Sequence, residues 1–202
     1  MKKGRIQSLE LLKATKFLSL YEAKYKNKFN EDKKWIIASR KDEATLSAQY
    51  NGEKEEKVDA VVLAALHEEE EKLVVIKQFR VPLNDYVYEL PAGLVDGDEM
   101  PYTAATRELK EETGLDLVQI YENKSNPKAY FSAGMTEESG AFVYCSCKGN
   151  LSKDGLEADE DIEPMLLTRE EAKALLASDV KMDIKAFLVL QSFAQLGMDI
   201  LK

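Results

Sequence analysis

The sequence predicts an α/β protein that begins with a small antiparallel β subdomain. Apolar strand-like runs recur along the chain, helical signals separate or follow them, and a polar stretch at 41–57 divides the pattern into two parts. The 202 residues, 45% of them hydrophobic, suffice for one sizeable domain and an appendage. We therefore expect residues 1–56 to form the β subdomain and residues 57–202 to form the main domain.

The charge balance argues against some partners. Lys and Arg total 28 against 37 Asp and Glu, a formal net charge of -9, which disfavours broad binding to nucleic acid or to an anionic membrane. An anionic substrate would need a metal ion or local arginines. No run of about 18 apolar residues occurs and the N-terminus lacks the apolar stretch of a secretory signal, so we expect a cytoplasmic protein.

The two cysteines are expected to be reduced and structural. Cys145 and Cys147 stand one residue apart in a strand-like run, which points both side chains to one face. Zinc would want about four ligands, and the chain has one histidine and no second cysteine pair.

The N-terminal part is expected to contain an antiparallel strand pair. Lys16–Lys24 partly alternates apolar and polar residues, and Lys34–Arg40 is a short β-branched run. Residues 41–57 are polar and include Asn51-Gly52, so we expect a turn and a boundary there.

The main part is expected to open with a β-hairpin. Its strands are the apolar runs Val58–Leu66 and Lys72–Phe79. His67–Glu71 between them is charged and would form the solvated tip, which makes His67 an incidental surface histidine.

Strands and helices follow one another in the rest of the chain. Gly114 is placed to end a helix as a left-handed cap, and Thr168 begins another with a capping box. The expected strands are Tyr86–Leu90, Asp116–Glu122 and Ala141–Lys148, and the expected helices are Tyr102–Thr113, Thr168–Ala177 and Asp183–Leu196.

Three glutamates share one turn of the helix before Gly114. Glu108, Glu111 and Glu112 are related by i, i+3 and i+4, so their carboxylates should converge on one face. Repulsion costs roughly a few tenths of a kcal/mol per pair, and a divalent cation would relieve it. Oxygen ligands favour Mg²⁺ or Mn²⁺ over zinc, and Arg107 could hold one acid in a bidentate pair. A Glu-rich turn alone is also typical of a solvated helix face.

The surrounding segment decides between these readings. Residues 93–115 fit the pattern Gly, five residues, Glu, seven residues, Arg-Glu-apolar-x-Glu-Glu-x-Gly-apolar at every fixed position. This pattern resembles the signature of the Nudix hydrolases, which implies an α/β/α sandwich around a mixed sheet. The resemblance implies that Glu99 and Arg107 orient the loop and the helix, and that Arg107 and Glu111 belong to the catalytic group. The metal ligands it implies are the carbonyl of Ala92 and the carboxylates of Glu108, Glu111 and Glu112.

The flanking motifs resemble one branch of this family, the ADP-ribose pyrophosphatases and nucleoside diphosphate sugar hydrolases. The motif from Lys77 to Arg80, followed by Tyr86-Val-Tyr-Glu-Leu-Pro-Ala-Gly93, implies that Arg80 contacts a substrate phosphate and that Glu89 also binds substrate. In the same branch a strand tryptophan stacks on adenine and a nearby arginine holds the nucleotide, positions matched by Trp35 and Arg40. A core or interface anchor is the alternative for Trp35.

The general base is implied by the same resemblance. The loop Ser132-Ala-Gly-Met-Thr-Glu-Glu138 is similar to a Ser-Pro-Gly-x-x-x-Glu loop of this branch, which makes Glu138 the best fit and Glu137 the reserve. Ala133 departs from the usual proline, which loosens the loop and weakens the link to ADP-ribose. A surface loop that simply carries acids is the alternative.

Together these features imply Mg²⁺-dependent hydrolysis of ADP-ribose to AMP and ribose 5-phosphate by a metal-activated water, with Mn²⁺ as a possible substitute. The branch also implies a homodimer with shared active sites. Alternatives are hydrolysis of UDP-, GDP- or ADP-sugars, a non-catalytic nucleotide sensor, and removal of oxidised triphosphates. The sensor would be expected to lack one of the three glutamates, and cleansing enzymes generally lack the N-terminal strands.

Overall fold

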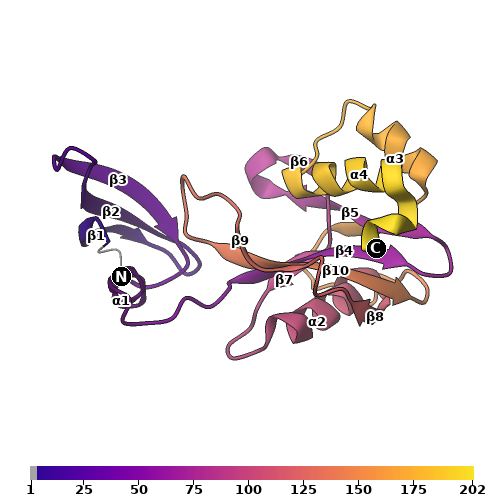
Figure 1. Cartoon of the computed structure of the whole chain (residues 1–202), viewed down its shortest axis with the longest axis horizontal. Helices are drawn as coiled ribbons and strands as arrows, with labels where there is room; N and C mark the ends of the chain where they lie inside the picture. Colours follow the sequence, from indigo (N-terminus) through magenta and orange to yellow (C-terminus); the bar gives the residue numbers. More distant parts are fainter. Residues whose placement is uncertain (1–3) are drawn as a thin grey trace. The chain divides into compact units, whose positions relative to one another are not determined.

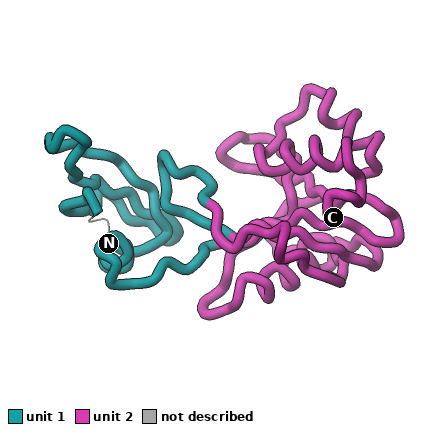
Figure 2. The backbone as a smooth tube through the Cα atoms, in the orientation of Figure 1, with its two compact units in different colours: residues 1–59, 130–140 teal, residues 60–129, 141–202 magenta. Residues whose placement is uncertain are grey.

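The computed structural model describes residues 4–202, which divide into two compact units (Figure 2). Unit 1 consists of the described residues up to Asp59 and of Tyr130–Gly140, and unit 2 consists of Ala60–Ala129 and Ala141–Lys202. The segment 130–140, which carries the Ser132–Glu138 loop, therefore belongs with the N-terminal strands. The sequence did not predict this association, because the segment lies far along the chain from the N-terminal strands.

Unit 1 contains a three-stranded antiparallel sheet in the order β1-β2-β3 (Figure 1). The strands are β1 (Ile6–Ala14), β2 (Ser19–Lys26) and β3 (Asp32–Ser39). The expected strand pair is confirmed as β2 and β3, which pair from Ser19↔Ser39 to Lys26↔Asp32. β1 was not expected, because most of its side chains are exposed and it carries no clear alternation.

The polar stretch expected to be a turn contains a helix, α1 (Glu43–Asn51). The side chain of Asp42 caps it by accepting a hydrogen bond from Thr45 N at 2.7 Å, and Gly52 ends it in the left-handed region at φ 73°. Leu46 is its one buried residue, so the helix has no apolar stripe that periodicity could reveal. The Asn51-Gly52 signal marks a helix end and not a hairpin.

Unit 2 is built on a mixed eight-stranded sheet, confirming the α/β/α sandwich. Its main path is β11-β5-β4-β10-β8, with β6 paired to β5, β7 to β4 and β9 to β10. Figure 1 shows α2 on one face, and α3 and α4 on the other. The strands are β4 (Ala60–His67), β5 (Lys72–Arg80), β6 (Asp85–Glu89), β7 (Ala92–Leu94), β8 (Asp116–Ile120), β9 (Asn126–Tyr130), β10 (Ser139–Lys148) and β11 (Ile162–Leu167). The helices are α2 (Pro101–Thr113), α3 (Arg169–Leu176), α4 (Ile184–Leu196), and the 3-10 turns η1 (Val81–Leu83) and η2 (Gly197–Leu201).

The core lies around β4, the strand that is buried along its whole length. A strand covered on both faces needs apolar residues at every position, which explains the continuous run Val61–Leu66. Cys145 and Cys147 on β10 lie in the same core as free thiols, as expected, and burial raises the pKa of both.

Most expected elements of unit 2 are confirmed, including the β4–β5 hairpin, α2 and the capping box of α3. The strands that were missed are β7, β9 and β11, of which the first follows Pro91 directly and the others contain Pro127 and Pro164. Proline disfavours a strand interior, so long-range pairing decides these three segments. The expectation for His67 was wrong: this residue ends β4, is 2% exposed, and bonds through Nε2 to the carbonyl of Gly149 at 2.9 Å.

The C-terminal helix is a core helix. Ile184–Leu201 is the one segment within residues 4–202 that is long and apolar enough to cross a membrane by length and composition alone. Its side chains Val189, Leu190 and Phe193 are nevertheless buried, and α4 packs on α3, β5 and β6. The apolar composition is explained by burial within the fold.

We expect Phe193→Ala to destabilise the protein by about 3–5 kcal/mol, because Phe193 is fully buried between α4 and its neighbours. Leu196→Ala on the same helix is the control, since Leu196 is 52% exposed and should change stability by less than about 0.5 kcal/mol. Urea unfolding of both variants measures the difference. Equal midpoints would contradict the packing of α4.

Candidate active site

Two of the three glutamates on α2 face the sheet. The buried residues of this helix are Ala104, Ala105, Glu108, Leu109, Glu112 and Thr113. Glu108 and Glu112 thus share the inward face with the apolar residues, while Glu111 is partly exposed. A solvated acidic face is excluded for these two carboxylates.

Glu112 is the most deeply buried acid of the group, with 2% exposure. The backbone N–H of Ala92, at the start of β7, donates to its Oε2 at 3.0 Å. Burial raises the pKa of Glu112 well above the usual range, and this one hydrogen bond opposes the rise. The carboxylate therefore lies where a positive charge would stabilise it.

Glu108 explains why a glycine stands at the start of the motif. A Cβ placed on Gly93 would come within 1.9 Å of the Glu108 carboxyl group, so its carboxyl occupies the space a side chain would fill. Glu108 is 8% exposed, and burial raises its pKa although Arg107 acts in the opposite direction. Gly93 and Glu108 together form one edge of the site.

Arg107 ties the loop before α2 to the helix. Its Nη1 donates to Glu108 Oε1 at 2.8 Å and to Glu111 Oε2 at 2.9 Å, and its Nη2 donates to Glu99 Oε2 at 3.0 Å and to the Leu94 carbonyl at 2.9 Å. The hydrogen bond from Arg107 also lowers the pKa of Glu99. One guanidinium thereby holds three acids and one carbonyl in place.

The three carboxylates do not converge on one point in this structure. Across residues 4–202, no group of three His, Cys, Asp or Glu side chains is arranged to hold a metal ion. Glu108 and Glu111 instead turn to Arg107, and Glu112 turns to Ala92, which separates like charges. The donor set still fits a hard divalent cation, because it offers carboxylate oxygens, two of them buried with raised pKa values. The metal ligands remain a prediction.

Arg80 and Glu89 form a bidentate ion pair beside this group. Arg80 Nε donates to Glu89 Oε1 at 2.6 Å and Nη2 donates to Oε2 at 2.8 Å. The hydrogen bond that Arg80 donates to Glu89 raises the pKa of Arg80, and the charges of Glu89, Glu112 and Asp183 add to the rise. The structure therefore brings together Arg80, Glu89 and Glu112, three predicted site residues from separate segments.

Glu160 was missed by the sequence analysis. It lies in the acidic loop between β10 and β11, and its charge raises the pKa of both Glu108 and Glu112. The loop is seated on α2, since Ser152 N donates to the Thr113 carbonyl at 3.0 Å and a Cβ on Gly155 would come within 2.7 Å of the Glu111 backbone. Its run of acids was the available signal, but such runs are common on surfaces.

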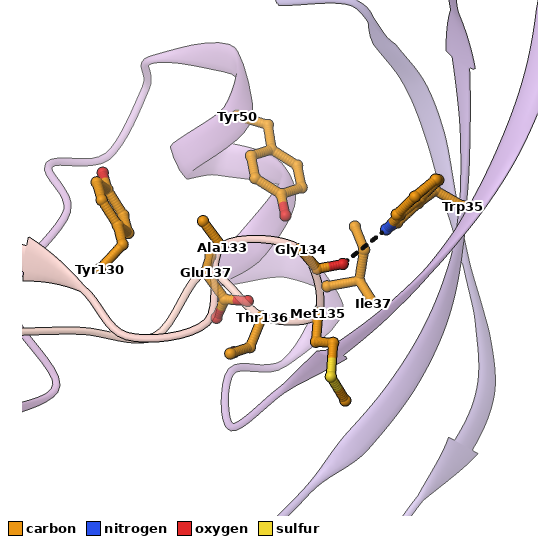
Figure 3. A pocket seen from close by; sticks show the side chains of 9 residues that line it. All are labelled: Trp35, Ile37, Tyr50, Tyr130, Ala133, Gly134, Met135, Thr136 and Glu137. Atoms are coloured by element: carbon orange, nitrogen blue, oxygen red, sulfur yellow. Dashed lines mark hydrogen bonds between the residues drawn. The ribbon is translucent and has the colours of Figure 1, made fainter. Parts of the chain in front are cut away.

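The predicted base-binding residue Trp35 lies in unit 1 at a cavity of about 280 Å³ (Figure 3). The cavity is lined by Trp35, Ile37, Tyr50, Tyr130, Ala133, Gly134, Met135, Thr136 and Glu137. Trp35 is 54% exposed and its Nε1 donates to the Gly134 carbonyl at 3.2 Å, which excludes the core-anchor alternative and leaves the interface one open. The aromatic and apolar lining suits a planar ring.

Of the two predicted general bases, Glu137 lines this cavity, and both Glu137 and Glu138 already have partners. Glu137 Oε1 accepts from Ser39 Oγ at 2.6 Å and from Lys41 Nζ at 3.2 Å. Glu138 Oε1 accepts from Arg40 Nε at 2.8 Å. The structure thus joins two predicted substrate residues, Trp35 and Arg40, to the loop of the predicted bases.

Known proteins resemble this chain over most of its length. The NUDIX domain matches residues 56–187. The chain is 32% identical to putative nudix hydrolase 2 of Caenorhabditis elegans over 67% of its residues and 61% of that protein. It is 34% identical to an ADP-ribose pyrophosphatase of Bacillus subtilis over 61% of its residues and 65% of that protein, and 29% identical to an ADP-sugar pyrophosphatase of Mus musculus over 55% and 48%. These matches span less than two thirds of each relative.

A solved structure described as an ADP compounds hydrolase superposes with a TM-score of 0.65, covering 96% of this chain and 95% of the other. At 15% identity this likeness concerns the fold alone. The domain match, in contrast, spans well over half of the chain and includes Gly93, Arg107 and the glutamates of α2. The protein belongs to the NUDIX family.

Proposed function

We propose that the protein hydrolyses the diphosphate linkage of ADP-ribose, releasing AMP and ribose 5-phosphate, in a reaction that depends on Mg²⁺. The observation that carries the proposal is the pair of buried carboxylates on α2, Glu108 and Glu112, beside the Arg80–Glu89 ion pair. Relatives named ADP-ribose pyrophosphatase and ADP-sugar pyrophosphatase support the substrate class.

Different residues of the chain would bind the metal and the substrate phosphate in such a site. Glu108, Glu111, Glu112 and the carbonyl of Ala92 would hold Mg²⁺ or Mn²⁺. When bound, the metal would neutralise diphosphate oxygens and acidify a water molecule. Arg107 hydrogen-bonds to Glu108 and Glu111 and orients them, and Arg80 would bind a phosphate through the guanidinium donors that Glu89 leaves free.

The proton of the attacking water needs a carboxylate acceptor. The resemblance points to Glu138, with Glu137 in reserve. Glu160 is a further candidate, because within unit 2 its charge acts on both Glu108 and Glu112. Each would act on a water molecule within hydrogen-bond reach.

The nucleotide end of the substrate is assigned to unit 1, where Trp35 would stack on adenine and Arg40 would hold the nucleotide. We also propose a homodimer with shared active sites, located in the cytoplasm. In support, the N-terminal strands and turns of unit 1 expose many apolar side chains that a second copy could cover. They are Leu11, Leu12, Phe17, Leu18, Leu20, Phe29 and Ile36.

Hydrolysis of other nucleoside diphosphate sugars is the second candidate function. It is favoured by the ADP-sugar pyrophosphatase relative and by Ala133, which stands where the ADP-ribose enzymes usually have proline. The same acids and arginines would serve either substrate.

A panel of ADP-ribose and ADP-, UDP- and GDP-sugars tests the function directly. With Mg²⁺ present, ADP-ribose should be cleaved fastest, and chromatography should identify AMP and ribose 5-phosphate in equal amounts. Rapid cleavage of UDP- or GDP-sugars without release of AMP from ADP-ribose would overturn the substrate and keep the reaction class. Tight binding without turnover at any Mg²⁺ or Mn²⁺ concentration would favour the sensor.

Glu112→Gln should lower kcat by more than about 100-fold, because replacing residues that only support a ligand already costs about 10–100-fold. In EDTA at pH 7.5 the same variant should melt at a higher temperature than the wild type, because burial raises the pKa of Glu112 on folding, which costs stability as the pH rises above the unfolded-state pKa. Each kcal/mol gained should add about 2–4 °C. Calorimetry measures the shift, and wild-type turnover would refute the ligand role.

Gly93→Ala should lower kcat by about 10–100-fold while the fold survives, since the three atoms nearest to the added Cβ all belong to the Glu108 carboxyl group at the end of a side chain. Metal titration should show weaker binding of Mn²⁺. Circular dichroism provides the control for folding. Unchanged activity would mean that the position of the Glu108 carboxylate does not matter.

A further inference from the structure

The Ser132–Glu138 loop lies along the end of β3. Trp35 Nε1 bonds to the Gly134 carbonyl, Ala38 N donates to the Met135 carbonyl at 2.9 Å, and the Ser39 and Arg40 side chains reach Glu137 and Glu138. Along these contacts, the residue numbers of the Trp35–Arg40 segment and of the loop increase in the same direction. The loop is therefore a fixed part of unit 1.

The backbone of the loop does not depend on the side chain of Glu138. The Ala38–Met135 and Trp35–Gly134 bonds hold the loop before it. Glu138 N also donates to Thr136 Oγ1 at 3.1 Å. An exposed ion pair contributes little stability. The contact between Glu138 and Arg40 is therefore not explained by a role in holding the loop in place.

Glu137 has a separate, structural task. Its Oε1 is shared by Ser39 and Lys41, and Lys41 Nζ also bonds to Asp59 Oδ1 at 2.6 Å. Although burial acts against it, the hydrogen bonds and charges of Asp59 and Glu137 raise the pKa of Lys41. This network is largely buried and links the loop to β3 and to Asp59, so Glu137 anchors the loop.

The contact between Glu138 and Arg40 restricts the arginine. Glu138 takes the Nε–H, the donor closest to the chain, and within the described residues 4–202 this is the one bond of the Arg40 side chain. Both Nη groups are left unbonded, on a side chain that is 47% exposed. The bond at Nε orients the plane of the guanidinium, while its outer edge remains available for two parallel bonds to an anion.

We propose that Glu138 is a positioning residue that acts through Arg40: it fixes the guanidinium so that the Nη groups bind the diphosphate of the substrate. This inference rests on the proposed function for the identity of the anion. It assigns Glu138 a role different from the proton acceptor that the sequence resemblance implies. Arg80 offers a parallel in unit 2, where Glu89 holds both Nε and Nη2.

Two substitutions at the same position separate these roles. Glu138→Gln keeps an oxygen that can accept from Arg40 Nε but cannot take a proton, whereas Glu138→Ala removes the acceptor. A positioning residue tolerates the first change and not the second. A general base tolerates neither.

The experiment titrates ADP in EDTA, so that binding is measured without metal or turnover. We expect Glu138→Gln to bind within about 3-fold of the wild type, and Glu138→Ala and Arg40→Ala to bind about 10-fold more weakly. The double variant Glu138→Ala/Arg40→Ala should bind no more weakly than Arg40→Ala alone. Glu22→Ala is the matched control, since Glu22 pairs with Lys34 at 2.7 Å on the same sheet and has no assigned role.

The second measurement is the turnover of ADP-ribose with Mg²⁺ by the same variants. Glu138→Gln should retain a higher kcat than Glu138→Ala and should keep the shape of the pH profile. A loss of kcat beyond about 100-fold at unchanged ADP binding would make Glu138 the base and overturn the proposal. So would ADP binding by Glu138→Ala equal to the wild type, or no ADP binding by the wild type. If ADP binds as expected but ADP-ribose is not cleaved, the proposed function alone fails.

Discussion

The site of unit 2 depends on buried negative charge. Removing a carboxylate from water is costly unless it gains hydrogen bonds or a counter-charge, and α2 turns two of them, Glu108 and Glu112, toward the sheet. The surrounding features compensate this cost. Gly93 leaves space for one carboxyl group, Ala92 N–H reaches the other, and Arg107 neutralises the outer part of the cluster.

This compensation is incomplete, and the shortfall favours binding of a cation. Arg107 already serves Glu99, Glu108 and Glu111, so its single positive charge is divided among three acids. Glu112 receives one neutral donor, and burial raises its pKa although the Ala92 hydrogen bond and the charge of Arg80 oppose the rise. A divalent ion would supply the positive charge that the site lacks, and such ions prefer the oxygen ligands that these carboxylates offer. The stability that these charges cost without metal would be recovered on binding.

The sequence predicted those parts of the molecule that local pattern determines. α2 has a strong helical period with Gly114 after it, and the β4–β5 hairpin has two apolar runs around a charged tip, so both were found. α1 has almost no apolar face, and the proline-containing strand β11 forms through pairing with β5 across the sequence. For the site, too, only the local part could be predicted: the motif placed Arg107 and the glutamates on one helical turn. Contacts such as the one between Arg40 and Glu138, which are 98 residues apart, form only in the folded chain.

The two arginine–glutamate pairs show one solution to a common difficulty. A free arginine on the surface loses side-chain entropy when it binds a phosphate, which offsets much of the Coulomb attraction. A glutamate that bonds to Nε takes up this entropy cost during folding and orients the planar group in advance. It also adds a negative charge, which weakens attraction for a phosphate, so the arrangement favours a ligand whose geometry matches the outer nitrogens over any nearby anion. Arg40, held at Nε alone, keeps more free donors than Arg80, which gives two of its nitrogens to Glu89. Of the two, Arg40 is therefore better suited to a bidentate bond with one phosphate, and Arg80 to a single bond beside the carboxylates of α2.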